Sequence, residues 1–187
     1  LADNKRNAAL VLFIDSPGGG VYESDEVYAA VKTYKEKTKR PVYAYFASLA
    51  ASGGYYIGCA ADKIVANRNA LTGSIGVIAG HFFDLSRLME RYGVKSEMIH
   101  TGRNKTMGNV AEPLTDEQRA IMQSIADECY AQFVGIVAES RQLDAARVTE
   151  LADGRIYTAQ QAKGHGLVDD IAPFDEAVKI LKEREFG

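Results

Sequence analysis

The pattern of hydrophobic and polar positions along the chain contains two continuous apolar runs in its first 46 residues. Residues 8–15 read Ala-Ala-Leu-Val-Leu-Phe-Ile-Asp, and residues 42–46 read Val-Tyr-Ala-Tyr-Phe. Runs without polar alternation are typical of strands covered on both faces, as in a parallel sheet flanked by helices. Between them, apolar residues repeat at helical spacing over residues 23–39, with acidic residues at the start and basic residues at the end. That charge order complements a helix dipole and predicts a helix here.

The remaining pattern alternates short strands and helices, and its last third is mostly helical. Further strands are predicted at residues 63–66, within 71–78, at 95–100 and at 167–171. Further helices are predicted at residues 57–61, 84–92, 115–140, 144–152, 158–164 and 175–184. Thr115 with Gln118, and Thr158 with Gln161, have the spacing of capping boxes. The alternation over the first two-thirds indicates an α/β protein.

Length and charge limit the class of protein. The 187 residues are 47% hydrophobic and 25% charged, which is typical of one globular domain. We therefore treat residues 1–187 as a single domain. The net charge of −3 gives no indication of a nucleic-acid partner. Because the chain begins at Leu1 and enters a buried-strand pattern almost directly, we expect an N-terminal part with the first strands to be missing.

The metal-binding and thiol chemistry of the chain is sparse. Cys59 and Cys129 fall in predicted helices, far apart in sequence, and form neither a metal-ligand spacing nor a disulfide framework. We predict that both are buried free thiols. His100 and His165 have no cysteine or carboxylate at metal-binding spacing, so neither a metal nor another cofactor is predicted.

The stretch from Ser48 to Tyr56, Ser-Leu-Ala-Ala-Ser-Gly-Gly-Tyr-Tyr, carries the first candidate chemistry. Ser52 is predicted where a strand turns into a helix, beside the free N–H groups of Gly53 and Gly54. Such N–H groups bind anions, including the oxyanion of a tetrahedral intermediate. The alternative interpretation is a serine N-cap beside two glycines in a tight turn.

A second glycine-rich segment follows the first predicted strand. Ser16-Pro17-Gly18-Gly19-Gly20 indicates a loop with unusual backbone angles or a close approach to a ligand. No Gly-Lys-Ser/Thr follows, so this is not a phosphate-binding loop. A plain tight turn is the alternative.

Five motifs occur in order along the chain: Ser16-Pro17-Gly18-Gly19-Gly20, Ala51-Ser52-Gly53-Gly54-Tyr55-Tyr56, Ala61-Asp62-Lys63-Ile64, Leu71-Thr72-Gly73-Ser74-Ile75-Gly76-Val77 and Ala152-Asp153-Gly154-Arg155. Together they closely resemble the signal peptide peptidase A family, membrane-anchored bacterial serine proteases of the Clp/crotonase superfamily. The resemblance covers essentially the whole chain and fits the short, single-repeat form. It implies a Clp/crotonase-like superhelix of repeated β-β-α units.

The resemblance also implies a role for five residues of a Ser/Lys peptidase. Ser52 aligns with the nucleophile, and Lys105 aligns with the general base. Gly19 and Gly53 align with the backbone donors of the oxyanion hole, and Ser74 aligns with a hydroxyl that positions the lysine.

A lysine that acts as a general base needs apolar surroundings. It accepts a proton only in its neutral form, which burial in an apolar pocket favours. The family often has an acidic residue directly after this lysine, where this chain has Thr106. A carboxylate would favour the ammonium form, so Thr106 is compatible with a base at Lys105. The alternative interpretation is that Lys105 is a solvated loop lysine.

His81 is the rival base. Related Clp-type proteases use Ser, His and Asp, and His81 lies downstream of Ser52 as that arrangement requires. Asp84 or Asp62 would then orient the imidazole.

Two interpretations belong to other classes of protein. In a crotonase-type acyl-CoA enzyme, the N–H groups of Gly19 and Gly53 would stabilise an enolate and Ser52 would be idle. In a non-catalytic scaffold of the family, Ser52 would react with no acylating reagent.

The resemblance extends to substrates, partners and location. It implies cleavage of remnant signal peptides and other apolar peptides through an acyl-enzyme on Ser52. It implies a homo-oligomer, an octamer, in which Ser52 and Lys105 meet across a subunit boundary. It also implies attachment to the bacterial cell membrane through the missing N-terminal part, with the catalytic domain outside the cytoplasm.

Overall fold

The computed structural model describes residues 1–187 and divides into two compact units. The first unit comprises Leu1–Gly76 with Ala131–Gly187, and the second comprises Val77–Tyr130. The strands, all in the first unit, are β1 (Leu10–Ser16), β2 (Val42–Ala51), β3 (Lys63–Ala66), β4 (Leu71–Gly73), β5 (Ile156–Thr158) and β6 (Asp170–Ile171). The helices are α1 (Val21–Thr38), α2 (Gly53–Gly58), α3 (Ser86–Arg91), α4 (Asp116–Arg141), α5 (Ala145–Leu151), α6 (Ala159–Gly164) and α7 (Phe174–Phe186).

The six strands form one sheet organised around β2. Strands β1, β3 and β4 all pair with β2 in parallel, and β6 pairs in parallel with β3. Only β5 is antiparallel, against β4. A mostly parallel sheet with covering helices confirms the α/β class. The carboxyl end of β2, which leads into α2, therefore lies beside the ends of β1 and β4.

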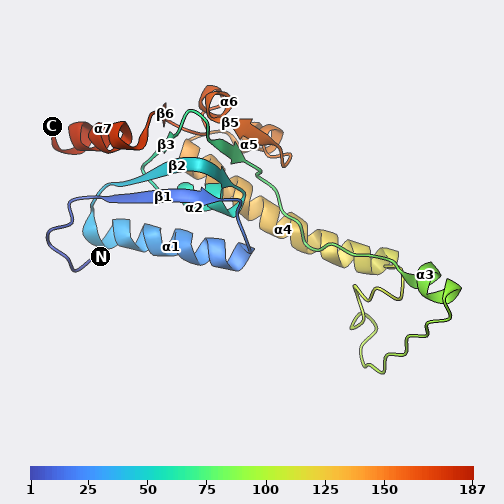
Figure 1. Cartoon of the computed structure of the whole chain (residues 1–187). Helices are drawn as coiled ribbons and strands as arrows, with labels where there is room; N and C mark the ends of the chain where they lie inside the picture. The colour runs from blue at the N-terminus through green and yellow to red at the C-terminus, as the bar shows by residue number, and fades with distance from the viewer. The chain divides into compact units, whose positions relative to one another are not determined.

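Helices cover both faces of β2, as its unbroken apolar run predicts. On one face, Tyr43 and Tyr45 form a buried cluster with Leu181 of α7. On the other, the Phe46 ring packs edge-on against Tyr55 of α2, with 5.9 Å between the ring centroids. Figure 1 shows α1 and α7 on opposite sides of the β1–β2 pair.

Strand β1 is less buried than its apolar run predicts. Its only strand partner is β2, so it lies at an edge of the sheet. Phe13 is 59% exposed, although its ring contacts Tyr45 and Phe174. A continuous apolar run indicates burial on average and does not reveal how many strands flank it.

One predicted strand is wrong, one is shorter than its predicted range, and one strand is missed. Within 71–78 only Leu71–Gly73 forms a strand, and residues 95–100 form none; Ile78 and Ile99 are 88% and 96% exposed. After Gly73, the backbone makes only two bonds to the segment before β5: Ser74 N–H to the Arg155 carbonyl, and Gly154 N–H to the Ile75 carbonyl. The missed strand β5 is only three residues long, too short for its strand-forming residues to stand out in the sequence.

The capping boxes predicted from the sequence are both present. Thr115 and Gln118 exchange side-chain and backbone hydrogen bonds at 3.2 Å each, directly before α4. Thr158 and Gln161 do the same at the start of α6. The structure thus confirms the predicted starts of these two helices.

A buried ion pair joins the end of α4 to the chain before β6. Arg141 donates to the Asp169 carboxylate at 2.9 Å and to the Gly166 carbonyl at 2.8 Å. Asp169 also accepts from the Ile64 N–H at 2.8 Å and pairs with Lys63 at 3.2 Å. Burial alone would raise the pKa of Asp169, but these hydrogen bonds outweigh it, so that pKa lies below its usual range.

Buried side chains pack α2 against the rest of the first unit. Tyr55 donates its hydroxyl hydrogen to the Leu167 carbonyl at 2.8 Å and is 0% exposed. Cys59 is also buried, and burial raises the pKa of its thiol to about 12. Both cysteines are free thiols, as predicted, although Cys129 is only half-buried. The Tyr55 hydrogen bond thereby anchors α2 to the segment before β6.

None of the helices is both long and apolar enough to cross a membrane.

Candidate active site

Ser52 occupies a strained turn between β2 and α2. Its backbone angles are φ 52° and ψ −121°, a left-handed φ that a non-glycine residue rarely adopts. Two hydrogen bonds hold the turn: Ser52 N–H donates to the Gly73 carbonyl at 2.8 Å, and Tyr56 N–H donates to the Ser52 carbonyl at 3.0 Å. Strain of this kind costs about 1–3 kcal/mol and is concentrated at functional sites.

The Ser52 hydroxyl is not used as a helix cap. Ser52 stands at the N-cap position of α2, but its side chain makes no capping hydrogen bond. The interpretation of Ser52 as a simple N-cap therefore does not hold. A half-buried hydroxyl on a sharp strand-to-helix turn has the placement of a nucleophile in many hydrolases.

The glycine-rich loop after β1 packs directly against this turn. Gly18 has φ 108°, and a Cβ at this position would lie 2.7 Å from the Gly53 nitrogen and 2.8 Å from the Ser52 Cβ. Neither the backbone angle nor the space admits a side chain. The Ser16 hydroxyl accepts from Gly18 N–H at 3.1 Å and fixes the loop from its other end. No sequence pattern indicates this contribution of Ser16.

Gly19 and Gly53, the two residues aligned with oxyanion donors, lie side by side. A Cβ on Gly53 would lie 3.2 Å from the Gly19 nitrogen. On the Cβ side of Gly19, nothing lies within 4 Å. Gly53 is the first residue of α2, so its N–H has no acceptor within the helix. Two backbone donors from separate segments therefore flank Ser52.

Ser74 lies at the adjacent strand end. The last paired residues of β2 and β4 are Ala51 and Gly73, so Ser52 and Ser74 are the next residues on neighbouring strands. Ser74 is half-buried with φ 50°, and its N–H donates to the Arg155 carbonyl at 2.8 Å. The first unit thus brings together Ser52, Gly19, Gly53 and Ser74.

Lys105 belongs to the second unit, in the loop between α3 and α4. Its N–H donates to the Gly102 carbonyl at 3.0 Å, and its side chain is exposed. The two preceding residues anchor the loop to the first turn of α4: Arg103 and Asn104 donate to Glu117 at 2.5 and 3.2 Å. The second unit therefore fixes the backbone at Lys105 but gives the side chain no apolar pocket of its own.

The rival base His81 also lies in the second unit, and its proposed partners bind elsewhere. His81 is exposed and stacks on Phe83, with ring centroids 4.5 Å apart. Asp84 accepts from the hydroxyl and N–H of Ser86, and these bonds lower the pKa of Asp84. Asp62, in the first unit, accepts from Val42 N–H and pairs with Lys35. Within the second unit, Asp84 is thus bonded to Ser86 and not to the imidazole of His81.

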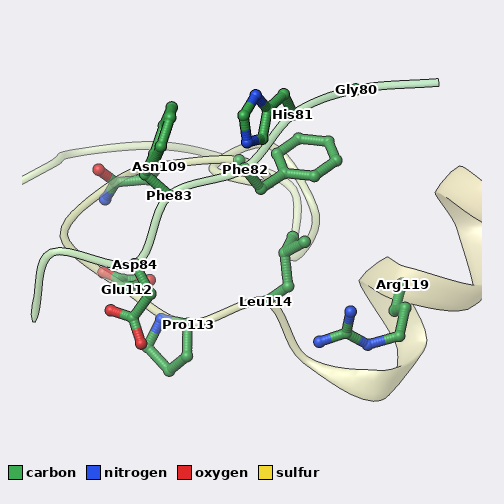
Figure 2. A pocket seen from close by; sticks show the side chains of 11 residues that line it. Gly80, His81, Phe82, Phe83, Asp84, Asn109, Glu112, Pro113, Leu114 and Arg119 are labelled. Carbon is green, nitrogen blue, oxygen red and sulfur yellow. The ribbon is translucent and has the colours of Figure 1, made fainter. Parts of the chain in front are cut away.

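His81 and Asp84 both line a cavity of about 280 Å³ in the second unit. Figure 2 shows the His81 ring at one end of the pocket, away from the carboxylates of Asp84 and Glu112. Phe82 and Leu114 also line this pocket. No group of three His, Cys, Asp or Glu side chains in the chain could hold a metal ion.

Fold and turn together define the class of protein. A parallel sheet carries a strained serine at the carboxyl end of its central strand, with a glycine-rich loop packed against it. Among solved structures, a ClpP1 mutant from Listeria monocytogenes matches with a TM-score of 0.61, covering 92% of this chain and 79% of that one. At 16% identity, this match concerns the fold alone, and it confirms the Clp/crotonase-like architecture.

Sequence comparison identifies the family. The model of peptidase family S49 matches residues 34–185, so the chain belongs to peptidase family S49. A Synechocystis sp. protein named as a candidate protease is 43% identical over 94% of this chain. An Enterococcus faecium protein named as a candidate signal peptide peptidase SppA is 38% identical over 99% of this chain. The chain spans 62% and 53% of the length of these two relatives.

Proposed function

We propose that the chain is the peptidase domain, residues 1–187, of a serine endopeptidase that cleaves apolar peptides. The observation that carries the proposal is the strained turn at Ser52, whose hydroxyl caps no helix and which the Gly18–Gly20 loop packs against. Membership of a peptidase family supports hydrolysis over turnover of an acyl-CoA or a purely structural role.

In this proposal Ser52 is the nucleophile. Its oxygen attacks the carbonyl carbon of the scissile peptide bond, and the carbonyl oxygen becomes an oxyanion. The N–H groups of Gly19 and Gly53 donate to that oxyanion, an interaction typically worth about 3 kcal/mol per donor. Collapse of the intermediate releases the amine and leaves an acyl-enzyme ester on Ser52. Water then hydrolyses this ester.

Lys105 is the proposed general base, with the Ser74 hydroxyl as the group that positions it. Lys105 would take the Ser52 proton during attack and give it to the leaving amine. A lysine base needs an apolar environment, because burial favours the neutral amine. The Lys105 side chain is exposed in the isolated chain. We therefore propose that burial is completed in a homo-oligomer, an octamer, in which Ser52 and Lys105 meet across a subunit boundary.

The proposed substrates and location follow from the same family. Remnant signal peptides are apolar and fit the proposed substrate class. The native protein would be attached to the bacterial cell membrane by a segment outside this chain, with the peptidase domain outside the cytoplasm. The candidate signal peptide peptidase from E. faecium supports the proposed substrate class by its name.

Hydrolysis of a fluorogenic apolar peptide by four purified proteins tests the assignment. Wild type is compared with Ser52→Ala, Lys105→Ala and His81→Ala, each checked for folding and assembly. The proposal predicts that Ser52→Ala and Lys105→Ala lose at least about a thousandfold in kcat, whereas His81→Ala stays within about twofold. An inactive His81→Ala with an active Lys105→Ala would instead identify a Ser/His enzyme.

A further inference from the structure

The two proposed oxyanion donors lie at the starts of two different helices. Gly19 precedes α1 by two residues, and Gly53 is the first residue of α2. The spacing between their N–H groups therefore depends on how α1 and α2 are held together. A tie between these two helices near their starts would fix that spacing.

Such a tie is present and consists of three polar side chains. Tyr56 of α2 donates its hydroxyl hydrogen to the Asp25 carboxylate of α1 at 2.5 Å. Gln132 of α4 donates to the Tyr56 hydroxyl oxygen at 2.6 Å and to the same Asp25 oxygen at 3.4 Å. The Tyr56 hydroxyl is thus both donor and acceptor, so its hydrogen is directed at Asp25.

Packing keeps the tie in one geometry. Tyr56 is 4% exposed, and its ring lies between Tyr28 of α1 and Phe133 of α4, at 5.4 and 5.1 Å. The helices also meet at Ser24, whose hydroxyl donates to the Gly20 carbonyl at 2.9 Å. That hydroxyl oxygen lies 2.2 Å from where a Cβ on Gly53 would be. Helices α1 and α2 are therefore in direct contact near the donors.

We propose that Tyr56, Asp25 and Gln132 form a clamp that sets the spacing of the Gly19 and Gly53 N–H groups and thereby tunes stabilisation of the oxyanion. The clamp residues are positioning residues, since they act through the backbone of α1 and α2. This inference rests on the proposed function, because it needs Gly19 and Gly53 to be the oxyanion donors.

The clamp should strengthen binding of the transition state and have little effect on binding of the substrate. An oxyanion donor contributes when it is placed for the tetrahedral oxyanion, and a small displacement weakens it steeply. Loss of the clamp should therefore lower kcat and leave KM nearly unchanged. A purely structural role would instead lower the amount of folded protein without changing kcat per folded site.

The test compares Tyr56→Phe with Tyr43→Phe. Tyr56→Phe keeps the ring and removes only the hydroxyl. Tyr43 is the matched control, because it is 2% exposed and also donates to a carboxylate, Glu185 at 3.0 Å, on the α7 face of the sheet. For Tyr56→Phe we expect kcat to fall about tenfold with KM within about twofold, and Tyr43→Phe to match wild type.

A tetrahedral mimic separates positioning from folding. A peptide boronic acid forms a tetrahedral adduct with a serine nucleophile and places an oxygen in the oxyanion hole. Its affinity for Tyr56→Phe should fall by the same factor as kcat/KM. Asp25→Ala should produce the same loss, and the double variant should lose no more than either single variant, since both remove one interaction.

Ser52→Ala distinguishes failure of the clamp from failure of the proposed function. If wild type hydrolyses peptide and Ser52→Ala does not, the function stands, and an unchanged kcat in Tyr56→Phe overturns the clamp. If no Ser52-dependent hydrolysis occurs, the proposed function fails, and hydrogen–deuterium exchange still tests the clamp. Tyr56→Phe should then speed exchange at residues 18–20 and 52–54 alone, and unchanged exchange there overturns the clamp.

Discussion

At the scale of single residues, the candidate site depends on backbone positions that admit no side chain. Gly18 combines φ 108° with a distance of 2.7 Å between its would-be Cβ and the Gly53 nitrogen. The glycine-rich loop after β1 was recognisable from the sequence as one that needs unusual angles. The contact of this loop with the Ser52 turn was not recognisable from the sequence, because 34 positions of the chain separate Gly18 from Ser52.

Gly18→Ala should both destabilise the chain and displace the turn. A non-glycine residue at this φ is strained, and its Cβ would push against Ser52 and Gly53. We expect the free energy of unfolding to fall by about 1–3 kcal/mol, measured by urea denaturation. Gly135→Ala is the control, because nothing lies within 4 Å of its would-be Cβ and alanine favours the helix. Equal stability of the Gly18→Ala variant and wild type would show that the loop is not held against the turn.

Asp169 should make the stability of the chain depend on pH in the acid range. Its pKa is lowered in the folded state, so its contribution is fully present above the unfolded pKa of about 3.9 and is lost as pH falls through the folded pKa. We expect Asp169→Asn to be less stable than wild type at neutral pH, with the difference shrinking below about pH 4. Thermal unfolding from about pH 7 to about pH 2.5 measures this.

The control for this pH series is Asp3→Asn, which removes an exposed carboxylate near the N-terminus. It should follow the wild-type curve at every pH. A difference between Asp169→Asn and wild type that stays constant across the whole acid range would contradict the lowered pKa of Asp169.

At the scale of elements, local signals predicted the helices well and the strand partners poorly. The capping boxes at Thr115 and Thr158 each specify a helix start through residues three positions apart, and both are present. Strands need a partner distant in sequence, and nothing in residues 95–100 shows that they lack one. The same limit applies to the clamp, whose Tyr56–Gln132 hydrogen bond joins residues 76 positions apart.

The capping box of α6 should contribute measurably to stability. In Thr158→Ala, the Gln161 N–H loses its acceptor at the helix start, where no intrahelical partner is available. We expect a loss of about 1 kcal/mol in the free energy of unfolding. Thr149→Ala is the control, because the Thr149 hydroxyl bonds only to the Ala145 carbonyl within α5. A loss no larger than that of the control would contradict the capping role.

At the scale of the whole molecule, the candidate chemistry is divided between two units. Ser52, Gly19, Gly53 and Ser74 lie in the first unit, and Lys105 lies in the second. The family resemblance implied all five residues, and the strand pairing of β2 with β4 explains why Ser52 and Ser74 are neighbours. The exposed side chain of Lys105 in the isolated chain matches the alternative interpretation of a solvated loop lysine, which the polar loop around it suggested from the sequence.

Mixed oligomers test whether two protomers share one active site. Ser52→Ala and Lys105→Ala proteins are unfolded, mixed in equal amounts and refolded together. If Ser52 of one protomer works with Lys105 of another, random assembly restores about one quarter of wild-type activity. If both residues work within one protomer, the mixture stays as inactive as either variant alone.

Covalent labelling tests whether Ser52 is a nucleophile. The wild-type protein is treated with a peptidyl fluorophosphonate carrying apolar residues, and the modified residue is located by mass spectrometry of its peptides. We expect one label per chain, on Ser52, with slow or no labelling of Lys105→Ala and none of Ser52→Ala. Labelling at another residue, or equal labelling of Ser52→Ala, would contradict this expectation.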